Sequence, residues 1–392
     1  MNKIEQMLQE LCPNGVEYKK LGEVCDFVNG FAFKSSLFRE KGDRIIRITN
    51  IDGTNVNIDD VKYFWKTDYK NDLQPFLIKG GDILIAMSGA TTGKIGYYNY
   101  EVDSYLNQRV GKFVPIKDKL STRFLYHILR NKTEYLYVLA GGGAQPNLSS
   151  TKLMDSLEIP VPPLPIQEEI VRILDHFTEL TAELQAELQA RQEQYEYYRN
   201  KLLTFDEESV TWMKMSEICN LQRGKVYSKE YLRDNQGIYS VYSSQTINNG
   251  ELGRISTYDF DGTYLTWTTD GAYAGTIFKR KGKFSITNVC GIISMKSDLV
   301  TMDFLYYWLS LKAKEYVYSG MGNPKLMSNQ VEKILVPIPA LSEQQRIVSI
   351  LDKFETLVND LSQGLPAEIA AVQEQYEYYR NKLLTFNRIK LI

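Results

Sequence analysis

The chain has few of the residues that build structural metal sites and disulfide frameworks. Its 392 residues include four cysteines and two histidines. The cysteines, at positions 12, 25, 219 and 290, form no Cys-x-x-Cys pair, whereas structural zinc sites draw on closely spaced cysteines and histidines. This scarcity argues against a bound metal. It also fits a chain kept in a reducing compartment, so we expect a cytoplasmic location.

Long apolar runs and catalytic motifs are missing as well. No apolar run approaches the roughly 20 residues of a membrane span, and the first twelve residues lack a signal-peptide core. An S-adenosylmethionine-dependent amino-methyltransferase would carry an Asn/Asp-Pro-Pro-Tyr/Phe loop, but QPN at 145–147 and NPK at 323–325 lack the second proline and the aromatic residue. The string GATTGKIG at 89–96 lacks the spacing and the Ser/Thr of a phosphate loop. We therefore expect no membrane association, no catalytic residues, and no cofactor or metal bound by this chain.

A long internal repeat is present. The string QEQYEYYRNKLLTF occurs at 192–205 and again at 373–386, and it closes two longer segments that match each other from 159–180 and 336–357. A repeat of this length indicates a tandem duplication. Apolar residues then recur in steps of three and four over both segments, which is typical of a coiled-coil seam. Four extra residues near Gly364 and Pro366 interrupt the second segment, and the proline is expected to kink or break the helix there.

Between the helical segments, short β-branched and aromatic runs alternate with glycine, asparagine and aspartate. Runs at 44–52, 81–89 and 94–100 predict strands, and 124–131 predicts a helix. We predict an α+β fold with two mixed α/β globular domains, separated by two long helices packed as an antiparallel coiled coil with pseudo-twofold symmetry. The predicted parts are domain 1 with an N-terminal helix (1–160), a long spacer helix (161–208), domain 2 (209–338) and a second long spacer helix (339–392).

The net charge of −2 is unevenly distributed. Residues 19–158 hold 20 basic against 16 acidic side chains, and 212–335 hold 15 against 11, whereas the helical segment 166–205 has 4 against 8. Ordinary surface scatter explains these counts about as well as an electrostatic footprint for nucleic acid does. Two mildly basic modules related by a twofold axis would suit a DNA duplex read at two half-sites.

The order of these segments, the proline-rich entry to each long helix and the opening CPNGVEYKKLGEV (12–24) resemble the DNA-specificity (S) subunit of type I restriction-modification enzymes over essentially the whole chain. The resemblance implies that each globular domain is a target-recognition domain for one half of a bipartite, asymmetric double-stranded DNA target. It implies that the repeated helices act as a spacer and dock two methyltransferase (modification) subunits, which would bind S-adenosylmethionine for DNA methylation. Restriction (motor-nuclease) subunits would join the full complex.

Residues that read DNA should be polar, lie in loops and recur in both halves, because base-edge contacts specify the sequence and phosphate contacts position the protein. The strings SGATTG (88–93) and AQPNLS (144–149) align with DGAYAG (270–275) and GNPKLM (322–327), and Asn107 aligns with Asn288. Each candidate alone could be an ordinary loop residue, and the two aligned asparagines could cap turns. In domain 1 the candidates are Lys34, Ser35, Arg47, Asn50, Ser88, Thr91, Thr92, Lys94, Asn107, Gln108, Arg109, Gln145, Asn147, Ser149 and Lys152. In domain 2 they are Arg223, Lys225, Tyr227, Ser244, Gln245, Asn248, Thr269, Asp270, Tyr273, Asn288, Asn323, Lys325, Ser328 and Asn329.

The repeated string supplies candidate partner contacts. Its first and third tyrosines fall on the seam in both copies and are expected in the core. The residues off the seam are candidates for binding the partner subunits, because aromatic and arginine side chains are enriched at interface hot spots; they are Tyr197, Arg199, Tyr378 and Arg380. A solvated helix face is the competing interpretation.

Two other functions stay open at this point. A coiled-coil assembly scaffold whose globular domains bind protein would not show the steep salt dependence of a phosphate-tracking interface. An enzyme in its own right would require methyl transfer or DNA cleavage by the purified chain alone.

Overall fold

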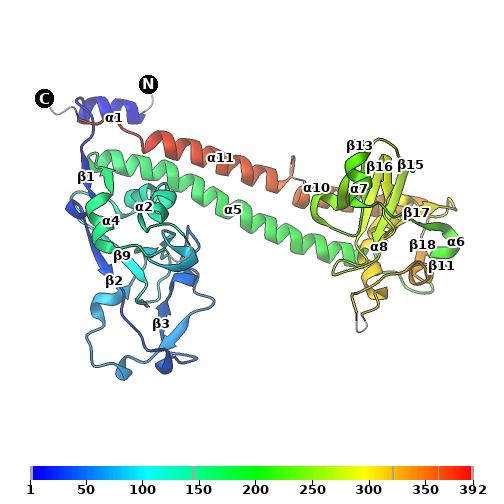
Figure 1. The fold of residues 1–392 in the computed structure, drawn as a ribbon, viewed down its shortest axis with the longest axis horizontal. Coiled ribbons are helices and arrows are strands. Elements are labelled where there is room, and N and C mark those ends of the chain that lie inside the picture. Colours follow the sequence, from blue (N-terminus) through cyan, green and yellow to red (C-terminus); the bar gives the residue numbers. More distant parts are fainter. Residues whose placement is uncertain (1–2, 144–145, 320–321, 361, 390–392) are drawn as a thin grey trace. The chain divides into compact units, whose positions relative to one another are not determined.

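The structure is a computed structural model that describes residues 3–143, 146–319, 322–360 and 362–389. The chain divides into two compact units (Figure 1). Unit 1 comprises Met1–Leu184 and Ile369–Ile392, and unit 2 comprises Gln185–Glu368. Each unit therefore combines one globular domain with helical segments that come from two different places in the chain.

In unit 1 an antiparallel sheet has the strand order β2-β9-β6-β7, and a mixed sheet has the order β4-β3-β8-β5. The strands of the first sheet are Cys25–Asn29, Val110–Pro115, Ile83–Ala86 and Ile95–Tyr97. Those of the second are Lys62–Phe64, Asp43–Ile46, Ser104–Leu106 and Leu77–Ile78. A short pair joins β1 (Tyr18–Lys20) to β10 (Glu158–Pro160). The helices of this domain are α1 (Lys3–Leu11), α2 (Thr122–Arg130), α3 (Thr133–Leu139) and α4 (Ser150–Ser156).

In unit 2 a six-stranded sheet has the order β12-β17-β15-β16-β13-β14. Its strands are Cys219–Arg223, Cys290–Met295, Phe260–Thr268, Ile277–Ile286, Gln236–Tyr242 and Glu251–Ile255. The short pair is β11 (Thr211–Lys214) with β18 (Leu335–Ile338). The helices are α6 (Met215–Ile218), α7 (Lys229–Asp234), α8 (Met302–Lys312) and α9 (Ser328–Val331).

The two domains share one pairing scheme. Strand β2 pairs with β9 and β6 with β9, as β12 pairs with β17 and β15 with β17. Each domain also has one parallel pair, β3 with β8 and β13 with β16. The ten-residue strand β16 is continuous and joins both groups of strands into one sheet, whereas the corresponding chain in unit 1 is split into β7 and β8. The predicted tandem repeat of two mixed domains is confirmed.

The long helical segments differ in continuity. Helix α5 runs unbroken from Leu164 to Leu202, whereas the second segment contains α10 (Leu341–Asn359) and α11 (Leu365–Leu383) (Figure 1). The predicted interruption near Pro366 is therefore confirmed, and the second spacer is two helices rather than one. Pro366 lies in the first turn of α11, where a missing N–H removes no helical hydrogen bond. A Cβ atom at Gly364 would lie 2.3 Å from the carbonyl oxygen of Thr356, so this close approach requires glycine.

Each copy of the repeated string packs on a helical segment of the other half of the sequence. In unit 1, Tyr379 of α11 stacks on Phe177 of α5, with ring centroids 5.5 Å apart and planes at 20°. In unit 2, Tyr198 of α5 stacks on Phe354 of α10, at 5.7 Å and 24°. The start of α5 shares a core cluster with the end of α11, and the start of α10 shares one with the end of α5. The paired helices therefore run in opposite directions within each unit.

A buried glutamine joins the start of each long segment to its globular domain. Gln167 is fully buried; its Oε1 accepts from the N–H of Ser121 (2.8 Å), and its Nε2 donates to the carbonyl oxygens of Lys119 (2.9 Å) and Pro162 (2.7 Å). Gln344, 177 positions later, is also fully buried and makes three bonds of the same kind. The duplication has thus preserved a hydrogen-bonding site at both junctions.

Local predictions are confirmed in part. The predicted helix at 124–131 is α2, and the predicted strands at 81–89 and 94–100 contain β6 and β7. The strand predicted at 44–52 is too long, because β3 ends at Ile46 and Ile48–Asn50 form a 3₁₀ turn. The Asn50 side chain accepts from the N–H of Arg47 (2.9 Å), a local bond that competes with strand pairing. Among the described helices, none has the length and hydropathy needed to cross a membrane.

Candidate nucleic-acid interface

In unit 2 one arginine brings several candidate residues together. Arg223 is the last residue of β12, and its Nε donates to the carbonyl oxygen of Asn288 (3.0 Å). Its Nη2 donates to the hydroxyl of Thr269 (3.0 Å) and lies 4.0 Å from a carboxylate oxygen of Asp270. Asp270 in turn forms a β-bridge with Lys325, whose ammonium lies 3.8 Å from the carboxylate. Four loops that are separate in the sequence therefore meet at one end of the strands β12, β15 and β17.

Unit 1 brings together the corresponding loops. Ser88 forms an antiparallel β-bridge with Asn147. The N–H of Met87 donates to the carbonyl oxygen of Arg109 (2.9 Å), so the 107–109 loop joins the same edge. The alignment made from the sequence places Ser88 opposite Asp270 and Asn147 opposite Lys325. The two domains therefore use the same backbone arrangement at this position, with a serine and an asparagine in one case and an ion pair in the other.

Some candidates are buried, which corrects the expectation that they face solvent. Asn50, Thr92 and Thr269 are 5%, 4% and 0% exposed, and Ser88 is buried as well. The amide of Asn50 donates to the carbonyl oxygen of Asp60 (2.9 Å), and the two threonine hydroxyls are bonded inside their loops. The side chains of Asn50, Thr92 and Thr269 therefore shape the loops and do not offer free groups to a ligand.

The remaining described candidates are exposed or half-buried. In unit 1 they are Lys34, Ser35, Arg47, Thr91, Lys94, Asn107, Gln108, Arg109, Asn147, Ser149 and Lys152. In unit 2 they are Arg223, Lys225, Tyr227, Ser244, Gln245, Asn248, Asp270, Tyr273, Asn288, Asn323, Lys325, Ser328 and Asn329. Gln145 lies outside the described residues.

Several accessible candidates also have partners within their own domain. Ser149 caps α4 by accepting from the N–H of Lys152 (3.3 Å). Lys225 and Tyr227 both donate to Asp259, at 2.5 and 2.6 Å. Burial alone would raise the pKa of Asp259, but the hydrogen bonds from these two residues outweigh it and lower the pKa. The carboxylate therefore stays charged and holds the two side chains beside each other.

Asn29 belongs to the same surface and was missed by the sequence reasoning. It is exposed at the end of β2, and its amide donates to the hydroxyl of Ser150 (3.2 Å). The duplication also relates residues 16–34 to 210–228, with Cys25 opposite Cys219, and this register places Asn29 opposite Arg223. Its alignment with Arg223, a candidate in the other half of the chain, was the signal that could have identified Asn29.

The repeated string presents the same surface in both units. Tyr197 is 58% exposed and Tyr378 is 60% exposed. Each packs edge-to-face against the next tyrosine, with ring centroids 5.3 Å apart. Lys201 lies 5.6 Å from the Tyr197 ring, and Lys382 lies 6.0 Å from the Tyr378 ring. Two different packing environments therefore produce one exposed arrangement of an aromatic ring and a lysine.

The tyrosines expected on the seam are not all buried. Tyr376 is buried, but Tyr198 and Tyr379 are each 37% exposed and lie at the margin of the helix pairs, which corrects their assignment to the core. Arg199 and Arg380 are half-buried and lie 5.5 and 5.3 Å from the first tyrosine ring of their own string.

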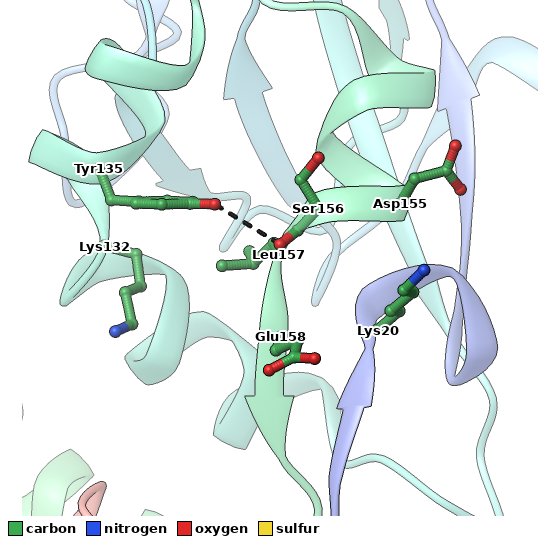
Figure 2. Close-up of a pocket in the computed structure, with 7 residues that line it drawn as sticks. All are labelled: Lys20, Lys132, Tyr135, Asp155, Ser156, Leu157 and Glu158. Atoms are coloured by element: carbon green, nitrogen blue, oxygen red, sulfur yellow. Dashed lines mark hydrogen bonds between the residues drawn. The ribbon is translucent and has the colours of Figure 1, made fainter.

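A surface hollow and two buried cysteines bear on the question of catalysis. A hollow of unit 1 has a volume of about 280 Å³ and neither histidine nor cysteine in its lining. Figure 2 draws the residues that line it, which are Lys20, Lys132, Tyr135, Asp155, Ser156, Leu157 and Glu158. Burial raises the pKa of Cys25 and of Cys219 to about 12, so neither thiol forms a nucleophilic thiolate at neutral pH. Among the described residues, no group of three His, Cys, Asp or Glu side chains could hold a metal ion.

Two solved structures with a similar fold come from type I restriction-modification systems. One is the crystal structure of a type I restriction-modification system S subunit from M. genitalium, with a TM-score of 0.61 and 17% identity over 94% of this chain and 96% of that chain. Another comes from a study of complex assembly and conformational transition of the type I restriction-modification system, with a TM-score of 0.59 and 18% identity over 97% of this chain and 99% of that chain. These likenesses concern the fold.

Sequence relatives carry the same description. A putative type I restriction enzyme specificity subunit of Haemophilus influenzae, S.HindORF215P, is 32% identical over 95% of this chain and 96% of its own length. A putative type I specificity subunit of Mycoplasma pneumoniae, S.MpnORF615P, is 40% identical over 60% of this chain and 96% of its own length. Residues 13–193 and 207–371 each match the family described as type I restriction modification DNA specificity domain. The chain therefore belongs to the DNA specificity subunits of type I restriction-modification systems.

Proposed function

We propose that this chain reads a bipartite, asymmetric DNA target, with one domain for each half-site, and docks two methyltransferase subunits through the repeated helical string. Restriction subunits would complete the assembly. The chain itself contributes recognition and no catalysis, and S-adenosylmethionine binds to the methyltransferase subunits.

The observation that carries the proposal is the pair of equivalent β-bridges. Ser88 with Asn147 and Asp270 with Lys325 lie at the same position of the two folds but carry different chemical groups. Base edges in the major groove are distinguished by their pattern of donors and acceptors. One backbone platform with two sets of side chains therefore suits the reading of two different base sequences.

The docking part of the proposal rests on the similarity of the two copies of the repeated string, whereas the recognition part rests on the different side chains at the two β-bridges. Tyr197 and Tyr378 have almost equal exposure, and both lie beside a lysine. Two equal surfaces on one chain suit two copies of one partner. Exposed aromatic side chains that become buried in a partner pocket account for much of the binding free energy at protein interfaces.

The test is to reconstitute the chain with its methyltransferase subunits and map methylated adenines by long-read sequencing of treated DNA. We expect a two-part motif with a fixed gap. Arg109→Ala should relax one part and Arg223→Ala the other, whereas the control Arg346→Ala, on the exposed side of α10, should leave the motif unchanged. A contiguous motif, or loss of the same part in both variants, would contradict the proposal.

Binding of the chain to the mapped duplex should also depend steeply on salt. Each phosphate neutralised by a lysine or arginine releases condensed counterions, so the logarithm of the binding constant falls linearly with the logarithm of the salt concentration. Salt-independent association would favour a scaffold that binds protein.

A further inference from the structure

Three loops of unit 2 each expose a large apolar side chain. Val226, Ile247 and Tyr273 are 77%, 75% and 57% exposed. Single exposed apolar residues are ordinary on protein surfaces, but these three follow strands of the sheet that presents the candidate DNA-reading residues. We call the three segments the β12 loop (224–228), the β13–β14 turn (243–250) and the β15–β16 loop (269–276).

The three loops are bonded to one short segment, 286–288, so they share one surface. In the β12 loop, the N–H of Lys225 donates to the carbonyl oxygen of Ile286 (3.2 Å). In the β13–β14 turn, the hydroxyl of Ser243 is hydrogen-bonded to that of Thr287 (3.0 Å). Arg223 ties the β15–β16 loop to the same segment through Asn288 and Thr269. The loops that carry the three apolar side chains are therefore joined to one segment that also belongs to the candidate interface.

The β13–β14 turn holds Ile247 in a defined conformation. The next three residues have positive φ, at 51° for Asn248, 54° for Asn249 and 79° for Gly250. Left-handed backbone is unusual for residues other than glycine, although asparagine adopts it more readily than most. The guanidinium of Arg280 is buried beneath the turn, and its Nη2 lies 3.0 Å from where a Gly250 Cβ atom would be. A strained, supported turn loses little conformational freedom when its tip contacts a ligand.

Domain 1 has smaller or more polar residues at the aligned positions. Ala32 stands opposite Val226, and Thr91 opposite Tyr273. The hydroxyl of Thr91 donates to the carbonyl oxygen of Ile48 (3.2 Å), so this hydroxyl is hydrogen-bonded within domain 1. At these two positions the exposed apolar side chain is therefore a feature of the second domain and not of the shared fold.

We propose that the second domain recognises thymine in its half-site by contact of Val226, Ile247 and Tyr273 with thymine C5-methyl groups. This inference rests on the proposed function. The methyl group of thymine is the apolar feature of the major groove, and apolar side chains contact it in protein–DNA complexes. Lys225 of the β12 loop is paired with Asp259, and Lys325 is paired with Asp270 of the β15–β16 loop. Loops that carry charged and polar residues besides the apolar ones suit a DNA duplex better than an apolar protein surface.

The test replaces thymine by deoxyuracil, which lacks only the methyl group. Duplexes carrying the mapped target are synthesised with deoxyuracil in one half-site or the other, and the domain-2 half-site is assigned as the one relaxed in Arg223→Ala. Deoxyuracil there should weaken binding about fourfold per contacted methyl, which corresponds to about 0.8 kcal/mol for one buried CH₂ group. Deoxyuracil in the other half-site should have a markedly smaller effect.

Variants turn this comparison into a thermodynamic cycle. Ile247→Ala should weaken binding to the thymine duplex severalfold and have little further effect on the uracil duplex, because the two changes remove the same contact. Val226→Ala provides an independent second cycle. The matched control is Ile238→Ala, which truncates an isoleucine of similar exposure (74%) outside the three loops; it should bind both duplexes as the unaltered chain does.

Each result has a definite consequence. If deoxyuracil in the domain-2 half-site leaves the affinity unchanged, or if Ile247→Ala and Val226→Ala weaken both duplexes equally, thymine-methyl recognition is wrong while DNA reading stands. If the chain shows no salt-dependent binding to any duplex, the proposed function fails and this inference fails with it.

Discussion

Truncation of a junction glutamine should destabilise one unit by a predictable amount. Gln344 is fully buried, accepts from the N–H of Thr301 (2.8 Å), and donates to the carbonyl oxygens of Leu299 and Pro339 (both 2.9 Å). A neutral hydrogen bond contributes about 1 kcal/mol net, so Gln344→Ala should cost about 3 kcal/mol. That is more than a hundredfold in the folding equilibrium, since about 1.4 kcal/mol corresponds to a factor of ten.

The assay is urea unfolding followed by tryptophan fluorescence, because three of the four tryptophans lie in unit 2: Trp212, Trp267 and Trp308. Gln344→Ala should move this transition to clearly lower urea. The matched control is Gln345→Ala, which removes the neighbouring glutamine from an exposed position and should leave the transition where it is. If both variants unfold together, or if Gln344→Ala costs less than about 1 kcal/mol, the three hydrogen bonds do not stabilise the junction as argued.

Three further predictions concern binding and pH. Arg109→Ala should cost about 1–3 kcal/mol at one half-site if it contacts a base; an equal loss on every sequence, measured by titration of variant duplexes, would make it a phosphate contact. Tyr197→Ala and Tyr378→Ala should each reduce the number of bound methyltransferase subunits from two to one, as measured by native mass spectrometry. Thermal unfolding should be unchanged, because both rings are exposed. Loss of both subunits from either variant would contradict two independent sites. Burial lowers the pKa of His127 in the folded chain, although the hydrogen bond to Asp175 opposes this. The free energy of unfolding should therefore fall as the pH drops from about 6.5, the ordinary histidine pKa, toward the lowered pKa of the folded chain. His127→Gln should remove that component of the unfolding profile, whereas Tyr307→Phe at the equivalent position in unit 2 should leave it in place.

The direction of the pH effect follows from the partners of His127 within unit 1. Its Nε2–H donates to the carboxylate of Asp175 (2.8 Å), and its Nδ1 lies 3.2 Å from the hydroxyl of Tyr376, which can donate to Nδ1 when the imidazole is neutral. Arg123 and Arg130 oppose a positive charge on the ring, while the carboxylate of Asp175 favours it. The unfolded chain binds a proton near the ordinary histidine pKa and the folded chain does not, so acidification favours the unfolded state.

The sequence predicted which loops lie together better than which of their side chains are accessible. Alignment of the two halves placed Ser88 with Asp270 and Asn147 with Lys325, and the structure pairs both sets in the same way. The same alignment gave no sign that Thr269 is fully buried or that Asn50 is engaged by its own turn. Burial of a polar loop residue depends on which distant loop covers it, and that information is not local.

The repeated helical string shows the same contrast between what local sequence predicts and what distant contacts decide. Its spacing predicted exposed side chains at Tyr197 and Tyr378, because helical periodicity alone sets which residues leave the seam. The exposure of Tyr198 and Tyr379 depended instead on how far each partner helix covers the seam. Periodicity cannot supply this, since it describes one helix and not the partner beside it.

The amino-acid sequence by itself determined the tandem repeat, the mixed α/β domains and the break at Gly364 and Pro366, because repeats, period and proline act through local backbone geometry. Tertiary structure alone decided which rings stack between the predicted antiparallel helices, Tyr379 on Phe177 and Tyr198 on Phe354, and that Arg223 gathers loops from distant parts of domain 2. Contacts between distant segments depend on which surfaces fit together in three dimensions, and no local pattern records that fit.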